Sequence, residues 1–354
     1  MRVLQLNFER GWRGGERQTL FCLRQLRAAG HQPELLARAG QPLAQAAQAE
    51  GFVVHTFNSV PSAMVYLLAC ARGFDILHAQ TANTLTWLAV LKPLMRRPVV
   101  FTRRTAFPVT PRKVARTSSK WRRVDAFVAI SEAAAAEPRR LGFKVSVIRS
   151  AIEPVQPDTA RMQAWLQHNG LQGRVLLGTA AALTREKDPL TLIRAVHHLR
   201  RTHPHIVFVH FGADGDVAYA ARQLVRELGL AGHYRFAGFE PQVERLFGLL
   251  SVFALSSVQE ALGSSVLDAF SQRVPVVATA AGGLKESLAD GRGVLCDIAD
   301  FRALAAGMAR LLDDQSFREQ TTTRAANYVA QEHDVAEMGR RYVLVYQALC
   351  GSVA

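Results

Sequence analysis

Short apolar segments alternate with amphipathic helical segments along nearly the whole chain, in two successive sets. The first set contains apolar segments at residues 3–6, 33–37, 53–57, 76–79, 99–102, 127–130 and 145–148. The segments between them are typified by residues 16–28, where Leu20, Leu23 and Leu26 share one helical face. Strands separated by helices favour right-handed crossovers, so the pattern predicts a parallel sheet covered by helices on both faces.

The second set begins at residue 175, after a loosely patterned stretch over residues 153–173. Its expected strands span residues 175–178, 206–211, 234–236, 252–255 and 274–279. The 354 residues are enough for two domains rather than one. We therefore predict an α/β protein with two doubly wound, Rossmann-like domains that face each other across a cleft. The N-terminal domain is expected over residues 1–155 and the C-terminal domain over residues 156–335.

The chain is basic, with 43 Lys and Arg against 29 Asp and Glu and a formal charge of +14. Such a balance suits three kinds of partner, namely nucleic acid, an anionic membrane surface and phosphorylated small molecules. The cations are concentrated in one acid-free run: Lys92, Arg96, Arg97, Arg103, Arg104, Arg112, Lys113, Arg116, Lys120, Arg122 and Arg123. No zinc, helix-turn-helix or aromatic-interleaved pattern accompanies the run, so nucleic acid is the least favoured partner.

In a parallel sheet, ligands bind beyond the carboxyl ends of the strands, so the residues that follow each strand are the candidate site residues. Gly14 and Gly15 follow the first strand and open a helix, which suits either close backbone approach to a ligand or a plain tight turn. His78 ends a later strand of the same domain. Arg103 and Arg104 directly follow the strand over residues 99–102 and are expected on the acceptor side of the cleft.

The second domain carries cations and glycines at its strand ends. Arg185 and Lys187 lie in the loop after its first strand, where either cation could pair with a phosphate. Gly212 and Asp214 belong to a glycine turn after the next strand. Taken singly, these features are also explained by ordinary charged or tight turns.

The most informative stretch covers residues 255–283, in which Glu260 sits in a polar turn ahead of a loop of small residues. That loop contains Gly263, Ser264 and Ser265, and a helix carrying Asp268 follows it. Exposed backbone N–H groups and the helix dipole at such an N-terminus favour an anionic ligand, and acidic side chains beside them suit sugar hydroxyls.

The order of these motifs resembles the nucleotide-sugar-dependent retaining glycosyltransferases of the GT-B fold, in their group 1 or family four branch. The matching segments are RGGERQ (13–18), DILHAQ (75–80), VAISEA (128–133), ALTREKDPLTLIRAV (182–196), FGADGD (211–216), FAGF (236–239) and SSVQEALGSSVLDAFSQRVPVVATAAGGLKES (256–287). The family's two glutamates, separated by seven residues, correspond to Glu260 and Asp268, so the second carboxylate is one methylene shorter.

The resemblance implies specific roles in the second domain. Glu260 is expected to bind hydroxyls of the transferred sugar, Asp268 the ribose hydroxyls and Lys187 the diphosphate. A family arginine is replaced by Ala182, and Arg185 is the candidate substitute. The loop of Gly263, Ser264 and Ser265 is expected to contact the donor.

Roles follow for the first domain as well. Gly14 and Gly15 match a loop near the phosphates or the acceptor, and His78 is the surviving first histidine of a His-x-His segment, expected to act with Glu260 in catalysis. The C-terminal helix, over residues 336–354, is expected to cross back to the first domain.

The resemblance also implies a reaction, namely transfer of a hexose-type sugar with retention from a nucleotide diphosphate sugar to a glycoconjugate. The resemblance implies that no protein nucleophile is needed, and no DxD metal site is assigned, so neither a metal nor another cofactor is expected. The basic first domain suggests a lipid-linked acceptor such as a lipopolysaccharide core. Apolar stretches too short to cross a bilayer predict a cytoplasmic protein, with peripheral contact at the inner face of the membrane.

Two alternatives remain open from the residues. One is a nucleotide-sugar epimerase of the same fold, and the other is a non-catalytic basic protein that binds membrane or nucleic acid. The donor base, its sugar, the acceptor and the linkage are also left open, because pocket side chains decide them rather than the fold.

Overall fold

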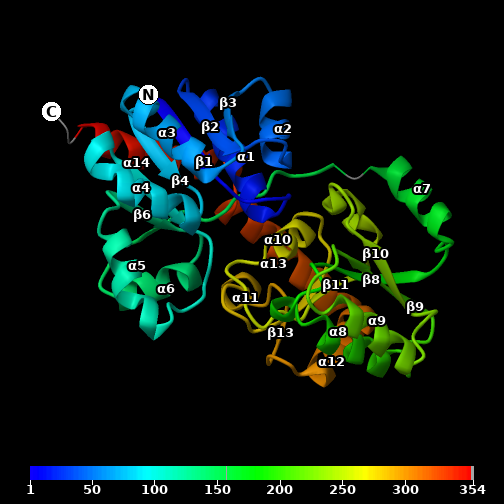
Figure 1. The fold of residues 1–354 in the computed structure, drawn as a ribbon. Coiled ribbons are helices and arrows are strands. Elements are labelled where there is room, and N and C mark those ends of the chain that lie inside the picture. The colour runs from blue at the N-terminus through cyan, green and yellow to red at the C-terminus, as the bar shows by residue number, and fades with distance from the viewer. Residues whose placement is uncertain (157, 352–354) are drawn as a thin grey trace. The chain divides into compact units, whose positions relative to one another are not determined.

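The computed structural model describes residues 1–156 and 158–351, and the chain forms two compact units (Figure 1). Unit 1 comprises Met1–Ala151 and His333–Ala354, and unit 2 comprises Ile152–Glu332. Residues 352–354 of the predicted C-terminal helix lie outside the described part.

Unit 1 is built on a seven-stranded parallel sheet with the order β3-β2-β1-β4-β5-β6-β7. The strands are β1 (Arg2–Asn7), β2 (Gln32–Arg38), β3 (Val53–Phe57), β4 (Ile76–Ala79), β5 (Val99–Arg103), β6 (Ala126–Ala129) and β7 (Ser146–Val147). The chain runs outward from β1 to β3 and then returns to β4, which pairs with the other side of β1. The point between β1 and β4 is therefore the topological switch point, where ligands bind in sheets of this kind.

The helices of unit 1 lie in two layers, because right-handed crossovers place the helices of the two chain directions on opposite faces. They are α1 (Gly14–Ala28), α2 (Pro42–Ala49), α3 (Val60–Cys70), η1 (Ala71–Gly73), α4 (Ala82–Met95), η2 (Pro111–Lys113), α5 (Val114–Trp121), α6 (Glu132–Arg140) and α14 (Val335–Gly351). Helix α1 packs against α2 and α14, while α4 packs against α3 and α5.

Helix α14 belongs to the core of unit 1, as its red ribbon among the cyan elements in Figure 1 illustrates. Met338, Tyr342 and Tyr346 are buried against residues of α1 and of the strands β1, β4, β5 and β6. The predicted return of the C-terminal helix to the first domain is confirmed, since this apolar face would otherwise be left in water.

Unit 2 contains a six-stranded parallel sheet with the order β10-β9-β8-β11-β12-β13. The strands are β8 (Val175–Ala180), β9 (Ile206–Phe211), β10 (Tyr234–Gly238), β11 (Val252–Leu255), β12 (Val276–Thr279) and β13 (Val294–Cys296). Strand β11 pairs with β8, so the switch point of this sheet lies between them.

The helices of unit 2 complete a second doubly wound layer structure. They are α7 (Thr159–Asn169), η3 (Arg185–Lys187), α8 (Pro189–Leu199), α9 (Ala218–Glu227), η4 (Val243–Leu249), α10 (Ser264–Ser271), α11 (Leu284–Leu288), α12 (Phe301–Asp313) and α13 (Gln315–Glu332). Helices α8, α9 and α12 share one core cluster with the sheet, while α10 packs against η4 and α13.

The predicted fold class of two doubly wound parallel sheets is confirmed, with differences at the sheet edges. Strand β7 has two residues instead of the four expected, and β12 begins at Val276 rather than at residue 274. Strand β13 was not predicted; it is a three-residue edge strand, too short to carry a pattern. The expected helix over residues 243–249 is the 3-10 helix η4.

Candidate functional site

The switch point of unit 2 brings together the loops that follow β8 and β11. The β8 loop ends in η3 and carries Lys187. Helix α8 then begins with Asp188 as its N-cap and Pro189 in its first turn, as predicted. The Asp188 carboxylate accepts a hydrogen bond from the Thr191 N–H at 3.2 Å, which fixes the end of the loop. Lys187 is therefore held on a rigid turn at the carboxyl edge of the sheet.

Lys187 forms an ion pair with Glu260, which lies in the loop after β11. Both side chains remain partly exposed, so the pair faces solvent at the mouth of the switch point. The Ser256 hydroxyl links the same two loops, because it donates to the backbone carbonyl groups of Lys187 at 2.9 Å and of Asp188 at 2.7 Å. A cation and a carboxylate predicted separately from the sequence are thus neighbours in the structure.

The backbone around Glu260 is fixed from two sides. The Val258 N–H donates to the Glu186 carbonyl oxygen at 2.9 Å, and the Gly283 N–H donates to the carbonyl oxygen of Glu260 at 2.9 Å. A β-carbon added to Gly282 would lie 2.0 Å from that same Glu260 oxygen, so only glycine fits there. Gly282 and Gly283 therefore let the chain pass directly behind the backbone of Glu260 and Ala261.

Helix α10 begins beside this loop, with Gly263 as its N-cap at φ +84°. Ser264 and Ser265 form its first turn, and among the described residues no acceptor is recorded for their backbone N–H groups. Unpaired N–H groups and the helix dipole make such an N-terminus attractive to an anion. This is the environment that the sequence predicted for a donor phosphate or sugar.

Asp268 lies on the second turn of α10 and is only 6% exposed. A buried carboxylate is unfavourable unless it is paired or hydrogen-bonded, so burial of Asp268 implies polar groups around it. Its short side chain places the carboxylate closer to the helix axis than a glutamate would.

Three further donor-side candidates lie apart from the Lys187–Glu260 pair. The Arg185 side chain is 84% exposed and is paired with Asp216, at 3.3 Å between Nε and Oδ2. Asp214 is paired with Arg222 at 2.9 Å. Arg185 and Asp214 are thus each paired with an oppositely charged neighbour in the same loop or the adjoining helix, and their contact with a donor stays a prediction.

Gly212 has a structural reason to be glycine that the sequence did not show. Its φ is +156°, and an added β-carbon would lie 1.9 Å from the Ala181 carbonyl oxygen. The loops after β8 and β9 cross here, and Leu183 and Asp214 form a bridge just beyond the crossing. The close crossing of the two loops therefore requires glycine at position 212.

The switch point of unit 1 gathers a second group of polar residues. Gly14 and Gly15 open α1, and the Arg104 side chain lies against Gly15, with Cδ 3.6 Å from the position of an added β-carbon. The Arg104 guanidinium donates to Gln80 Oε1 at 2.5 Å and to Ser150 Oγ at 3.4 Å. Its Nε is buried and has no partner among the described residues, whereas the side chain as a whole is only half-buried.

Glu16 is a member of this group that the sequence reasoning did not single out. It is buried, accepts from the Asn7 amide at 3.2 Å and from the Arg13 N–H at 2.9 Å, and closes the first turn of α1. Burial raises the pKa of Glu16, although these hydrogen bonds and Arg104 oppose the increase. An acidic residue in the first helical turn after a glycine pair was the signal that could have identified it.

His78 does not occupy an open position. It is fully buried, with Nδ1 2.7 Å from the Tyr346 hydroxyl and Nε2 2.8 Å from the Thr102 hydroxyl. Burial, with a smaller contribution from Arg104, holds its pKa well below the ordinary value, so the ring is neutral. Nδ1 contacts Tyr346 of α14 and Nε2 contacts Thr102 of β5, so the structure gives His78 a structural role and the predicted catalytic role stays a prediction.

Arg103 also differs from its prediction as an acceptor-side residue. It is buried, stacks over the Trp121 ring, and donates to the carbonyl groups of Thr105, at 2.8 Å, and Phe107. A strand-end arginine can fold its own loop instead of contacting a ligand, and Arg103 does so. Of the two adjacent arginines, Arg104 alone faces the switch point.

The described residues contain neither a metal-ligand cluster nor a membrane-spanning helix. No group of three or more His, Cys, Asp or Glu side chains among them is arranged to hold a metal ion. Within the same residues, no helix combines the length and the apolar character needed to cross a bilayer.

Comparison with known families assigns both units. Residues 163–328 match the family described as "Glycosyl transferases group 1", and residues 12–156 match "Glycosyltransferase Family 4". Lipopolysaccharide core biosynthesis glycosyltransferase LpsE of Rhizobium meliloti (strain 1021) is 31% identical over 135 residues, which cover 38% of this chain and 38% of that protein. LpsD of the same organism is 28% identical over 199 residues, 56% of each protein. The matches thus span less than two thirds of these relatives.

Solved structures agree with this assignment at the level of the fold. The crystal structure of Anabaena Alr3699/HepE in complex with UDP-glucose matches 99% of this chain and 100% of that chain, with a TM-score of 0.88 at 19% identity. The apo form of the lipopolysaccharide outer core galactosyltransferase WaaB matches 99% and 100%, with a TM-score of 0.70 at 13% identity. Both sheets and their helices therefore follow an arrangement known from glycosyltransferases.

Proposed function

Because the chain belongs to the group 1 and family 4 glycosyltransferases, we propose that it moves a sugar from a nucleotide diphosphate sugar to a glycoconjugate. The observation that carries the proposal is the Lys187–Glu260 pair at the switch point of unit 2. In a nucleotide diphosphate sugar, the sugar is joined directly to the second phosphate. A site for it needs a cation and a hydroxyl-binding carboxylate side by side, as this pair provides.

In the proposed complex, Lys187 turns from Glu260 to the diphosphate, and Glu260 accepts hydrogen bonds from sugar hydroxyls. The N–H groups of Ser264 and Ser265 supply further donors for the phosphate or sugar oxygens. Asp268 binds the ribose hydroxyls. Arg104, beside Gly14 and Gly15 in unit 1, is assigned to the acceptor.

The roles of these residues follow from the negative charge that develops on the departing phosphate during sugar transfer. The bond between the anomeric carbon and the phosphate oxygen breaks, and its electron pair stays on the departing phosphate. Lys187 and the N-terminus of α10 stabilise that growing negative charge in the transition state. The acceptor oxygen bonds to the same face of the sugar, and its proton passes to the phosphate oxygen, so configuration is retained without a protein nucleophile. We propose that this needs no metal ion or other cofactor.

For the acceptor we propose a lipid-linked glycan of the cell envelope, such as a lipopolysaccharide core. The formal charge of +14 and the basic run in unit 1 support an anionic, membrane-held acceptor. The names of the relatives LpsE and LpsD support the same class. The protein is then expected in the cytoplasm, with peripheral contact at the inner face of the membrane.

Nucleotide release tests the proposal. Wild-type protein, Glu260→Gln and the exposed control Glu227→Gln are incubated with a panel of nucleotide sugars and with extracted lipid-linked glycans. We expect acceptor-dependent release by the wild type and by the control, and a roughly 10²- to 10³-fold lower rate for Glu260→Gln. Equal rates of nucleotide release by all three proteins would show that Glu260 does not take part in the reaction.

The product analysis separates the alternatives. Nuclear magnetic resonance of the new glycosidic bond should show the donor's anomeric configuration, whereas inversion would refute the retaining mechanism. An epimerase would instead change the sugar without an acceptor. A non-catalytic binding protein would release no nucleotide with any donor.

A further inference from the structure

Two neighbouring helices of unit 1 expose an unusual amount of apolar surface. Val65 and Leu68 on α3 are 66% and 47% exposed, and Val90 and Leu94 on α4 are 57% and 58% exposed. Each pair is spaced by three or four residues, so each pair lies on one helical face. Helices α3 and α4 pack against each other, which makes the four side chains parts of one surface. We call it the α3–α4 face.

The α3–α4 face is also nearly free of charge. Helix α3 contains no charged residue, and Lys92 is the charged residue of α4. The two helices end together, because the Arg72 guanidinium, just after α3, donates to the Leu94 carbonyl oxygen at 3.1 Å. Contiguous exposed apolar surface on a folded domain marks an interaction site.

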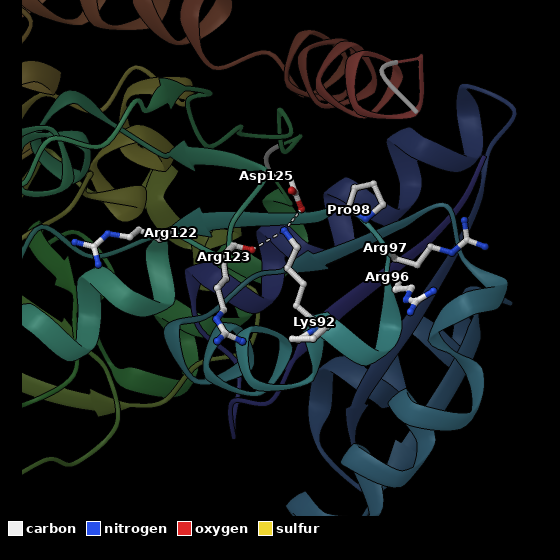
Figure 2. Close-up of a pocket in the computed structure, with 8 residues that line it drawn as sticks. Lys92, Arg96, Arg97, Pro98, Arg122, Arg123 and Asp125 are labelled. Atoms are coloured by element: carbon white, nitrogen blue, oxygen red, sulfur yellow. Dashed lines mark hydrogen bonds and ion pairs between the residues drawn. The ribbon is translucent and has the colours of Figure 1, made fainter. Parts of the chain in front are cut away.

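A basic hollow of ≈ 490 Å³ opens at the C-terminal ends of α4 and α5 (Figure 2). It is lined by Lys92, Pro93, Arg96, Arg97, Pro98, Arg122, Arg123 and Asp125. Lys92 is neutralised by its ion pair with Asp125, which leaves four arginines without an acid in the lining. Figure 2 shows Arg96 and Arg97 extending side by side from the end of α4.

Helix capping explains part of this cluster but not all of it. The Arg123 guanidinium donates to the Ala89 carbonyl oxygen at 2.8 Å, and that of Arg97 donates to the carbonyl oxygen of Arg72 at 2.5 Å. Cations at helix C-termini are stabilising for this reason. A guanidinium has five N–H donors, however, so most of the donors of these arginines remain available to an anion.

The hollow lies at the opposite edge of the sheet from the candidate site. Pro98 and Asp125 precede β5 and β6, whereas Gln80 and Arg104 follow β4 and β5. Helix α4 connects the two edges, and its fourteen residues span about 21 Å. A flat partner lying along α4 would therefore contact the hollow and still reach the edge of unit 1 that carries Arg104.

We propose that the α3–α4 face docks on an anionic lipid bilayer, with a lipid phosphate seated in the hollow beside Arg96 and Arg97. Apolar side chains enter the boundary between headgroups and acyl chains, while the arginines hold the phosphates around them. Free phosphate or a nucleic-acid backbone would bind the arginines of the hollow but would make no use of the apolar side chains of the α3–α4 face. The inference rests on the proposed membrane-linked acceptor for its purpose, although the binding itself does not require sugar transfer.

Co-sedimentation with vesicles tests the surface. The full-length protein is mixed with phosphatidylcholine vesicles that contain or lack phosphatidylglycerol. The hollow variant is Arg96→Asn/Arg97→Gln, with Asn at the first position because Arg96 has φ +51°. The apolar variant is Val65→Ser/Leu94→Ser. Matched controls are Arg226→Gln/Arg245→Gln, which removes the same charge from unit 2, and Val53→Ser/Leu344→Ser, which changes exposed apolar residues elsewhere in unit 1.

We expect wild-type binding to anionic vesicles that weakens with salt, and little binding to neutral vesicles. The hollow variant should bind roughly thirtyfold more weakly, since each basic residue near the surface contributes about a sixfold factor. The apolar variant should lose roughly tenfold, and both controls should bind like the wild type. Unchanged melting temperatures show that the variants are folded.

Three results would overturn the proposal. If the wild type binds vesicles but neither variant is impaired, the membrane surface lies elsewhere. If inorganic pyrophosphate or duplex DNA binding depends on Arg96 and Arg97 while vesicle binding does not, the hollow serves another anion. Absence of any vesicle binding also refutes the surface, whereas nucleotide release with a detergent-solubilised acceptor would still test the proposed transferase function separately.

Discussion

Asp268 is one position at which the chain departs from the pattern of the family that it resembles, which has glutamate there. Its carboxylate is 6% exposed on the second turn of α10, so a longer side chain must find room in a packed region. We assign it to the ribose of the donor. On this assignment, aspartate fits the packed region around α10 and still binds the ribose hydroxyls.

Replacing Asp268 tests this assignment. Asp268→Ala should weaken nucleoside diphosphate binding by about tenfold or more, because a hydrogen bond to a charged group is lost. Asp268→Glu should stay within about threefold of wild type, and calorimetric titration measures both. Full affinity in Asp268→Ala would mean that the carboxylate does not contact the nucleotide.

The buried His210 is expected to make the free energy of unfolding depend on pH. It is buried in unit 2 between the Tyr234 hydroxyl, at 2.7 Å, and the Ala181 carbonyl oxygen, at 2.9 Å. Burial lowers the pKa of His210 from 6.5 to about 4. Between these values the unfolded chain binds a proton that the folded chain does not, so stability is complete above pH 6.5 and falls as the pH decreases towards 4.

Urea unfolding between pH 7.5 and 4.5 measures this effect. The wild type should lose on the order of 3 kcal/mol of unfolding free energy to this one group. His210→Gln should be less stable at pH 7.5 but should show a shallower decline, while the exposed control His205→Gln should follow the wild type. An unchanged slope in His210→Gln would contradict the assignment.

Some residues of the candidate site could be predicted from the sequence and others could not. Lys187 and Glu260 were found because strand-end loops at a switch point converge, which depends on topology alone. Arg185, Asp214 and Arg103 follow strands in the same way, but the first two are paired with local charges and Arg103 folds its own loop. A strand-end position does not reveal whether a side chain faces a ligand or its own neighbours, and only three-dimensional contacts decide that.

At the scale of elements, α14 contributes to a buried hydrogen-bond network in the core of unit 1. The Tyr346 hydroxyl accepts from the Gln5 amide at 3.1 Å and lies 2.7 Å from His78 Nδ1. Gln80 extends the network through its 2.7 Å hydrogen bond to Gln5 and through its contact with Arg104. Helix α14 therefore supports the residues that hold Arg104 at the switch point.

Tyr346→Phe tests that support. Loss of the hydroxyl removes one buried hydrogen-bond partner from Gln5 and one from His78, so we expect a destabilisation of about 2–4 kcal/mol. The same substitution at Tyr219, which is 79% exposed, should change stability by less than about 0.5 kcal/mol. Equal effects in thermal unfolding would show that the network contributes nothing.

Elements differed in how well the sequence predicted them. Central strands such as β9, with all six residues buried, give long apolar runs and were placed correctly. The edge strands β7 and β13 have two and three residues, so their pattern is too short to define them. The order of strands in each sheet depends on long-range pairing, which local periodicity does not encode.

The whole molecule consists of two doubly wound units, and each unit carries polar residues at the switch point of its sheet. The division into two sheets was predictable because the alternation of strands and helices occurs twice. The return of α14 to unit 1 came from the family resemblance, since the apolar face of the helix does not specify its partner. The basic run was predicted as a surface for membranes, but the α3–α4 face beside it was found only in the structure.

The central claim is that unit 2 binds a nucleotide diphosphate sugar through the Lys187 site, and calorimetric titration with nucleoside diphosphates tests it most directly. Wild-type protein should bind at least one of UDP, GDP and ADP, and Lys187→Ala should lose roughly tenfold to a hundredfold in affinity. Arg226→Ala, which removes an exposed cation of α9 in the same unit, should bind like wild type. Undiminished binding by Lys187→Ala, or no binding by the wild type, would contradict the claim.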